Sequence, residues 1–173
     1  MKNQKRIMQI CRIALFSSLM AISSFISIPT PIPITFQTFA LFLMCDCLPY
    51  TQACISVLVY LTLGIMGLPV FAGFQSGVGT LLGPTGGFLI GYLFVALLYG
   101  LLSKLSMQKS LRFLFAIISL ILLYLFGGLW YAYLYGGSHV LTVCILPFII
   151  PDILKITLAL FASNRLRRIF KTI

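Results

Sequence analysis

Asp152 and Lys155 are the residues of this chain whose types and spacing most clearly point to chemistry. The chain holds only two acidic residues, Asp46 and Asp152. Asp152 and Lys155 are three positions apart, so they share one face of a helix. Such a pair in an apolar helix indicates either a structural ion pair or a polar site for a ligand or an ion path. Pro147 and Pro151 favour the second interpretation, because each removes a backbone donor and frees carbonyl groups that need partners.

The depth of this pair follows from its distance to the basic C-terminal cluster. Lys155 lies ten residues before Arg165, which is about 15 Å along a helix. Asp152 lies about one turn further, so both side chains are expected near the midplane of a membrane. A lone charge at that depth costs at least roughly 2.5–3.5 kcal/mol, so this is expected to be the one ion pair that the chain keeps inside the bilayer.

A glycine-rich segment over residues 67–87 is the second candidate site. Residues 67–79 read Gly-Leu-Pro-Val-Phe-Ala-Gly-Phe-Gln-Ser-Gly-Val-Gly, and residues 82–87 read Leu-Gly-Pro-Thr-Gly-Gly. Glycines at this density either let the backbone approach a ligand closely or serve turns. Thr35, Gln37 and Thr38, at the start of the second predicted helix, either cap that helix or line a pocket.

The sequence also disfavours several classes of function. Two acidic residues and one histidine offer neither an acid–base dyad nor a metal cluster, which argues against a membrane-embedded enzyme. A small channel, the other alternative, needs more polar residues along its pore. The five cysteines are odd in number and lie in or beside apolar segments, so we expect no disulfide framework and no metal site. The sequence has no P-loop, so we expect no ATP site and no cofactor in this chain.

The composition requires lipid around the elements that position these residues. Hydrophobic residues make up 61% of the chain and charged residues 8%, against roughly 25% charged residues in an ordinary soluble domain. We therefore predict an all-α integral membrane protein, multi-pass in the plasma (inner) membrane. The net charge of +10 comes from basic residues that flank apolar runs, so it indicates membrane orientation and not nucleic-acid binding.

Six apolar segments are predicted to form one membrane-embedded domain over residues 1–173. They lie at about 10–28, 34–48, 51–66, 86–103, 111–133 and 140–162. Basic clusters precede the first segment and follow the fourth and the sixth. Six crossings place all three clusters and both termini in the cytoplasm, which five or seven crossings do not. The second and third segments are short for a core of about 30 Å, so they either tilt and meet at Pro49 or extend into loops.

Small residues and the other acidic residue predict how the helices pack. Ala14 and Ser18 form a small-xxx-small pair in the first segment, as do Ser17 and Ala21. This spacing lets another helix approach closely, either from within the chain or from another subunit. Asp46 lies near the inner end of the second segment, where we expect an interfacial acid with access to water.

These motifs together resemble one transporter family. Residues 67–73, the glycines after them and residues 82–87 closely resemble the biotin-specific S component, BioY, of energy-coupling-factor transporters. The family's Pro-Ile-Pro…Thr-x-Gln-Thr pattern occurs at residues 31–38, and its Asp-x-x-Lys pattern occurs as Asp152 and Lys155. The resemblance spans nearly the whole chain.

The resemblance implies a six-helix S component, not an enzyme, that captures biotin from outside. It also implies docking on a membrane scaffold subunit driven by two cytoplasmic ATPase subunits. Ala14 and Ser18 resemble the small-residue motif of S components and are the expected docking residues. The chain departs from the family at residues 74–76, where small residues are usual, and at Pro151, where glycine is usual, so pocket geometry is expected to differ. The biotin-binding residues expected from these motifs are Asp152, Lys155, Gln75, Phe71, Phe74, Gly73 and Gln37.

Overall fold

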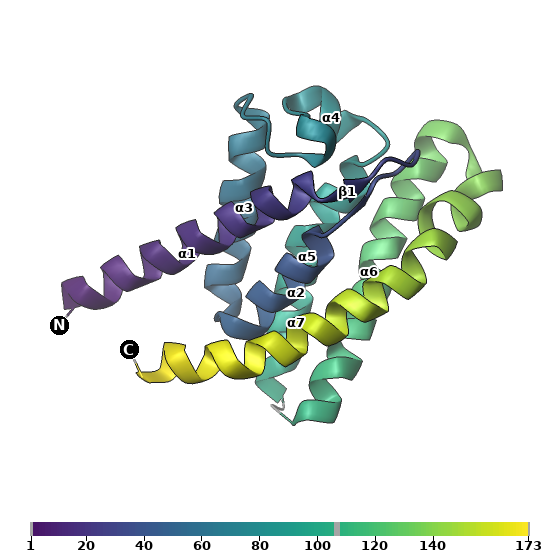
Figure 1. Ribbon diagram of the computed structural model, residues 1–173. Coiled ribbons are helices and arrows are strands. Elements are labelled where there is room, and N and C mark those ends of the chain that lie inside the picture. The colour runs from purple at the N-terminus through teal and green to yellow at the C-terminus, as the bar shows by residue number, and fades with distance from the viewer. Residues whose placement is uncertain (1, 106–107, 173) are drawn as a thin grey trace.

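The computed structural model describes residues 2–105 and 108–172 as a bundle of helices (Figure 1). Among these described residues, four helical stretches are long and apolar enough to cross a membrane. They are α1 (Lys2–Phe25), α5 (Gly86–Leu105), α6 (Lys109–Tyr135), and α7 (Leu146–Thr172) with the π-helical turn η3 (Leu141–Ile145) before it. The shorter helices are α2 (Gln37–Cys47), α3 (Tyr50–Ile65) and α4 (Val78–Leu82).

Helix α2 lies inside the bundle. Nine of its residues are buried, from Gln37 to Asp46, and it packs against α1, α5 and α7. Its 11 residues extend about 16 Å, too short to cross a membrane core of about 30 Å alone. The chain turns back at Leu48 and Pro49, so the two short helices meet at Pro49. In Figure 1 the long helices α1 and α7 run obliquely on either side of α2.

Helices α5 and α6 pack closely because glycines face bulky side chains across their interface. A Cβ built at Gly127 of α6 would lie 2.3 Å from the Phe88 ring of α5. A Cβ built at Gly87 of α5 would lie 2.4 Å from Cβ of Trp130 in α6. Glycine at these positions therefore lets the two helices lie closer together than any larger residue would allow.

Two connections close one end of the bundle, which we name the loop end. Between α1 and α2, strands β1 (Ser27–Ile28) and β2 (Ile34–Thr35) form an antiparallel hairpin. Between α3 and α5, residues 66–85 contain the 3₁₀ turn η1 (Ala72–Phe74), α4 and three glycines with positive φ, Gly67, Gly73 and Gly77. Figure 1 shows the second connection above α3 and beside the hairpin. Glycines in this segment therefore serve turns.

The described residues form seven α-helices, not six. Each predicted segment overlaps one of the six longer helices, and the seventh is the five-residue α4 within the glycine-rich segment. Helix α1 begins at Lys2 and not near residue 10, and α7 continues to Thr172. Both extend beyond the predicted bounds because lysine and arginine are good helix formers, whereas hydropathy marks only the apolar part of a helix.

The expectation for Asp46 is wrong. Its side chain is buried at the other end of the bundle, which we name the basic end, and it is 1% exposed. Arg112 Nη2 lies 3.1 Å from Oδ2, and Arg167 Nη2 lies 3.3 Å from Oδ1. The hydroxyl groups of Tyr99 and Ser163 also donate to the carboxylate, at 2.6 and 2.5 Å. Helices α6 and α7 close over the end of α2, and their arginines replace the solvation that water would give.

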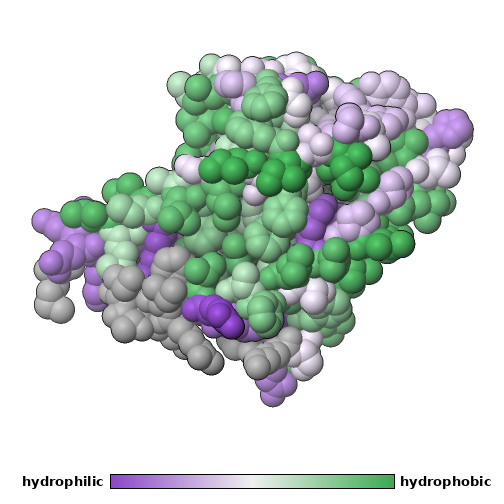
Figure 2. Space-filling view, in the orientation of Figure 1, coloured by the Kyte–Doolittle hydropathy of each residue, from purple (hydrophilic) through white to green (hydrophobic). Residues whose placement is uncertain are grey.

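The described part of the chain therefore contains a second buried ion-pair group besides Asp152 and Lys155. Arg112, which belongs to the basic cluster that follows the fourth predicted segment, is only 5% exposed and also donates to Asn164 Oδ1 at 3.0 and 3.1 Å. Figure 2 shows apolar side chains over most of the visible surface, with hydrophilic ones near the N-terminus, at the lower edge and, more weakly, over the loop end.

Candidate functional site

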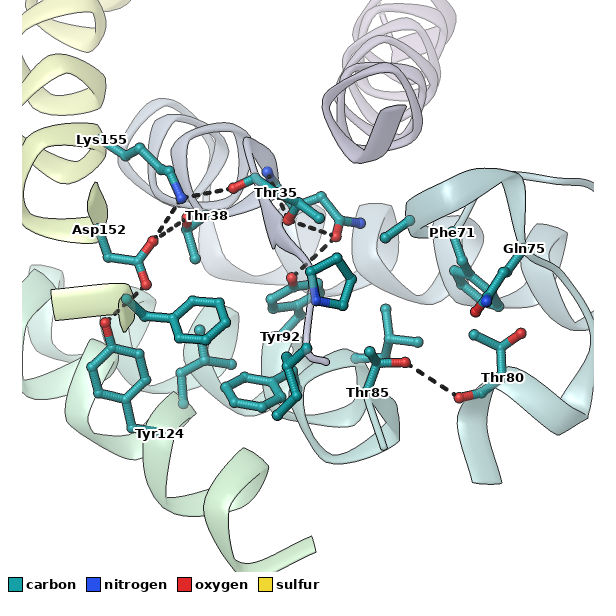
Figure 3. Close-up of a pocket in the computed structure, with 18 residues that line it drawn as sticks. Thr35, Thr38, Phe71, Gln75, Thr80, Thr85, Tyr92, Tyr124, Asp152 and Lys155 are labelled. Carbon is teal, nitrogen blue, oxygen red and sulfur yellow. Dashed lines mark hydrogen bonds and ion pairs between the residues drawn. The ribbon is translucent and has the colours of Figure 1, made fainter. Parts of the chain in front are cut away.

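A pocket lies under the loop end, where distant parts of the chain meet. Its walls come from β2 and the start of α2, the segment 71–85, and α5, α6 and α7. Phenylalanine, leucine and isoleucine side chains form the apolar surface. Figure 3 labels the polar residues that face it except Gln37, together with Phe71. The polar lining residues are Thr35, Gln37, Thr38, Gln75, Thr80, Thr85, Tyr92, Tyr124, Asp152 and Lys155.

Asp152 accepts three hydrogen bonds in the wall of this pocket (Figure 3). Lys155 Nζ and Thr38 Oγ1 donate to its Oδ1 at 2.9 and 2.8 Å. The Tyr124 hydroxyl donates to its Oδ2 at 2.9 Å. Asp152 is only 1% exposed, so these donors replace the water that an ionised carboxylate requires. An ionised carboxylate offers about four acceptor positions, so Oδ2 can accept one further hydrogen bond.

Lys155 joins α7 to the hairpin. Its Nζ donates to the backbone carbonyl of Thr35 at 2.7 Å as well as to Asp152. An ammonium group has three N–H donors, and these two contacts occupy two of them. Pro151 lies inside α7 directly before Asp152 and cannot donate a backbone hydrogen bond. The proline and the π-helical turn before α7 form an irregular start to the helix that carries the charged pair.

A second network surrounds the amide of Gln37. Thr35 Oγ1 donates to Gln37 Oε1 at 3.0 Å, and the Tyr92 hydroxyl donates to the same oxygen at 3.3 Å. Gln37 Nε2 donates to the Tyr60 hydroxyl oxygen at 2.5 Å. Because Lys155 binds the carbonyl of Thr35, the two networks meet at that residue. Polar groups from α2, α3, α5, α6 and α7 are therefore held in one connected arrangement.

The opposite wall is a turn that carries Phe71 and Gln75 (Figure 3). The Phe71 N–H donates to the Gln75 carbonyl at 3.0 Å, which closes the turn. The Phe71 ring lies edge-on to Tyr60, with ring centroids 5.6 Å apart. A Cβ built at Gly64 would lie 2.0 Å from Phe71 Cζ, so the ring occupies a slot that only glycine leaves open.

The pocket is narrow in this structure. Its cavity volume is about 40 Å³, whereas pockets that hold small ligands usually begin near 300 Å³. A depression lined by the hairpin and by residues 72–85 borders it and shares Pro33, Ala72, Gln75, Thr80 and Thr85 with it. Accommodating a ligand therefore requires movement of the walls, and these shared residues separate the pocket from the depression.

Comparison with known proteins decides the family. The model of the BioY family matches residues 1–172. The chain belongs to the BioY family. A protein named as a probable biotin transporter BioY, from Pyrococcus horikoshii, is 34% identical over 160 residues, which cover 92% of this chain and 96% of the relative. The biotin transporter BioY of Thermotoga maritima is 32% identical over 163 residues, covering 93% and 96%.

A solved structure agrees with this BioY assignment. The crystal structure of the S-component for biotin from an ECF-type ABC transporter superposes with a TM-score of 0.89 at 29% identity. The superposition covers 97% of this chain and 95% of the other. The fold of this BioY family member is therefore that of an S component. The proteins of the family named here are transporter components and not enzymes.

Five of the expected binding residues line the pocket of this BioY family member, and two do not. Gly73 lines the neighbouring depression instead. Phe74 is 65% exposed, and its ring stacks on Phe25 of α1. The residues that line the pocket are Asp152, Lys155, Gln37, Gln75 and Phe71.

The start of α2 faces the pocket, which answers one question that the sequence leaves open. Thr35, Gln37 and Thr38 all line the cavity. The N-cap residue of α2 is Phe36, and no side chain caps the helix there. Thr35 Oγ1 also accepts the N–H of Gln37, the first residue of α2, at 3.4 Å, so Thr35 both lines the pocket and contacts the start of the helix.

Two tyrosines of the site, Tyr92 and Tyr124, are not among the residues expected from the sequence. A signal for Tyr92 is present, because Tyr92, Val95 and Tyr99 recur at helical spacing and are all buried. A tyrosine inside an apolar helix also needs a partner for its hydroxyl group. Tyr124 has no comparable neighbour in the sequence, since its partner Asp152 lies 28 residues away.

The two small-residue pairs of α1 lie on different faces. Ser17 is buried and donates to the Ser56 carbonyl of α3 at 2.9 Å, and Ala21 packs against the core. Ala14 and Ser18 are exposed. The pair Ser17 and Ala21 therefore serves internal packing, whereas the face of Ala14 and Ser18 is open to another molecule.

The arrangement has the chemistry of a binding site. It offers an ammonium group, a carboxylate, an amide and hydroxyl groups beside apolar walls, which suits a ligand with both donors and acceptors. Within residues 2–105 and 108–172, no three His, Cys, Asp or Glu side chains lie together as a metal site requires.

Proposed function

We propose that this chain is the biotin-binding membrane subunit, or S component, of a vitamin uptake transporter. The observation that carries the proposal is the buried group of Asp152, Lys155, Thr38 and Tyr124 at the wall of a pocket, in a chain of the BioY family. A buried carboxylate and ammonium beside a cavity cost free energy that packing alone does not require. A ligand that hydrogen-bonds with both groups accounts for their presence.

Biotin has the chemical groups that such a pocket recognises. Its ureido ring has two N–H donors and one carbonyl oxygen, and its apolar tail ends in a carboxylate. Asp152 Oδ2 is a suitable acceptor for a ureido N–H, and the third N–H of Lys155 is a suitable donor to the ureido oxygen or the carboxylate. Gln75 can do either, and Phe71 offers apolar surface.

The proposed topology has six membrane helices, with α4 in an extracellular segment and both termini in the cytoplasm. The two short helices α2 and α3 act as crossings inside the bundle, where longer helices separate α2 from lipid. The basic residues near both termini, and Lys104 and Lys109 at the adjoining ends of α5 and α6, support this orientation. The loop end and its pocket then face outward, in one domain embedded in the plasma membrane.

The proposed partners are a membrane scaffold subunit and two cytoplasmic ATPase subunits. The sequence contains no P-loop, so energy for uptake has to come from another chain. The exposed face of Ala14 and Ser18 on α1 is the proposed docking face. Small residues there allow a partner helix to approach closely, and van der Waals packing is a main attraction between helices in lipid.

A biotin titration of the purified protein in detergent tests this function. We expect saturable binding of one biotin per chain, with desthiobiotin as a competitor that keeps the ureido ring but lacks the thioether. Nicotinamide, which lacks the ureido ring, serves as the matched control and should not compete. Absence of biotin binding below millimolar concentration in folded, monodisperse protein would refute the proposal.

A further inference from the structure

Phe74 has a backbone conformation that a bulky residue rarely adopts. Its φ is 59°, and it is the one non-glycine residue with positive φ in the described part of the chain. This region favours glycine, so the surrounding contacts must offset the strain of a phenylalanine there. The ring is 65% exposed and is not seated in the pocket. Contacts outside the pocket therefore hold this residue.

Those contacts come from the last turn of α1. The Phe74 ring stacks on Phe25 with centroids 4.5 Å apart and an interplanar angle of 18°. Next to it, the buried Ser24 donates through Oγ to the Val70 carbonyl at 2.7 Å. Val70 directly precedes the turn 71–75, and Phe74 lies within it. The end of α1 is thus attached to both sides of this turn.

The same turn forms a wall of the pocket. Phe71 and Gln75 line the cavity, and the Phe71 N–H holds the Gln75 carbonyl at 3.0 Å. Phe71 is 1% exposed and is fixed against Gly64 of α3, so that side of the turn is firmly seated. The stack of Phe74 on Phe25 is the exposed attachment and bears the strained backbone. It is therefore the contact that can open at the lower cost.

We propose that Phe74 is a positioning residue whose stack on Phe25 keeps the turn 71–75 closed over the pocket. Biotin leaves when this stack separates, because Gln75 then moves away from the cavity. The proposal rests on the proposed function for the identity of the ligand. The claim that the stack holds the turn is independent of the ligand, since the stack and the turn are features of the protein alone.

The test measures biotin dissociation from wild type, Phe25→Ala, Phe74→Ala and the double variant in lipid nanodiscs, by chasing labelled biotin with excess unlabelled biotin. Loss of a stacked aromatic pair corresponds to about a two- to tenfold faster dissociation. Biotin should dissociate from the double variant no faster than from the faster single variant, because the two single variants and the double variant all lose the same contact. Phe74→Tyr preserves the ring and should restore slow dissociation.

Leu82→Ala is the matched control. Leu82 is 62% exposed in the same connection, residues 66–85, and lines neither the pocket nor the depression.

Amide hydrogen exchange of residues 70–76 in ligand-free protein supplies a second readout that needs no biotin. We expect faster exchange at Phe71 in Phe25→Ala and Phe74→Ala than in Leu82→Ala. Unchanged exchange would overturn the proposal whether or not biotin binds. Faster exchange with unchanged dissociation, or single effects that multiply in the double variant, would also overturn it. Wild-type protein that binds no biotin would instead refute the proposed function, while hydrogen exchange still decides whether the stack holds the turn.

Discussion

Replacing Asp152 by asparagine keeps the size of the side chain and removes its charge. Lys155 Nζ then loses the countercharge 2.9 Å away and retains the neutral carbonyl of Thr35 at 2.7 Å. The Lys155 side chain is 10% exposed, so water replaces little of the lost interaction. Truncating one partner of a buried pair typically costs about 3–5 kcal/mol, which is roughly a hundredfold to several thousandfold in an equilibrium constant. We expect Asp152→Asn, and likewise Lys155→Met, to abolish measurable biotin binding in protein that is still inserted in the membrane.

The assay compares biotin titration with thermal unfolding of each variant in detergent. Thr157→Val is the matched control, because Thr157 is exposed on the same helix. Among the described residues, its hydroxyl group donates only to the carbonyl of Ile153, one turn earlier in α7. The double variant with Asp152→Asn and Lys155→Met removes the unpaired charge. It should therefore unfold at a higher temperature than either single variant while still failing to bind.

Wild-type biotin affinity in either single variant would refute a role of the pair in binding, since the pair would then be structural only. A double variant whose loss of stability equals the sum of the two single losses would refute the coupling of the two charges. That result would mean that the two charges contribute independently, in conflict with their shared hydrogen bond.

Four further predictions concern other parts of the molecule. Gly64→Ala should displace the Phe71 ring and weaken biotin binding at least about tenfold. The control Gly79→Ala, where a Cβ meets nothing within 4 Å, should bind biotin normally. Equal biotin affinities of the two variants in a titration would contradict this prediction. Asp46→Asn should lower stability by about 3 kcal/mol or more, measured by thermal unfolding, because the buried Arg112 and the half-buried Arg167 lose their countercharge; an unchanged unfolding temperature would show that the cluster is dispensable. Ala14→Trp or Ser18→Trp should preserve biotin binding but block co-purification with the scaffold and ATP-driven uptake, and a loss of biotin binding would instead assign this face to internal packing. Biotin should slow proteolysis or hydrogen exchange in residues 28–35 and 67–87, and unchanged protection at saturation would count against movement of these connections.

The positions of the helices along the chain were largely predictable. The segment predicted at about 86–103 is α5, Gly86–Leu105, and the one at about 51–66 is α3, Tyr50–Ile65. Glycine, proline and basic residues bound these apolar runs, so their limits show in the sequence. Helix α4 did not show, because its five residues lie in a glycine-rich stretch and contain too little pattern for one amphipathic face.

The charged pair of the site was predictable, but most of its partners were not. Spacing alone places Asp152 and Lys155 on one face of a helix. The donors Thr38 and Tyr124 come from residues 114 and 28 positions away, so only the packing of α2 and α6 on α7 brings them to the carboxylate. Phe74 was expected to face the pocket, and its left-handed backbone turns the ring to α1 instead.

The sequence by itself determined that the chain is an integral membrane protein, where its long helices lie, that Asp152 and Lys155 are neighbours, and which family it resembles. Only the tertiary structure decided that Asp46 is buried at the basic end and that Ser17, not Ser18, faces α3. The physical reason is that lipid and protein interior are both apolar. A soluble helix reveals its buried face by an apolar stripe, whereas a membrane helix is apolar on all sides and gives no such sign. Which faces meet is therefore set by close packing and by the pairing of buried charges, and both depend on residues far apart in the chain.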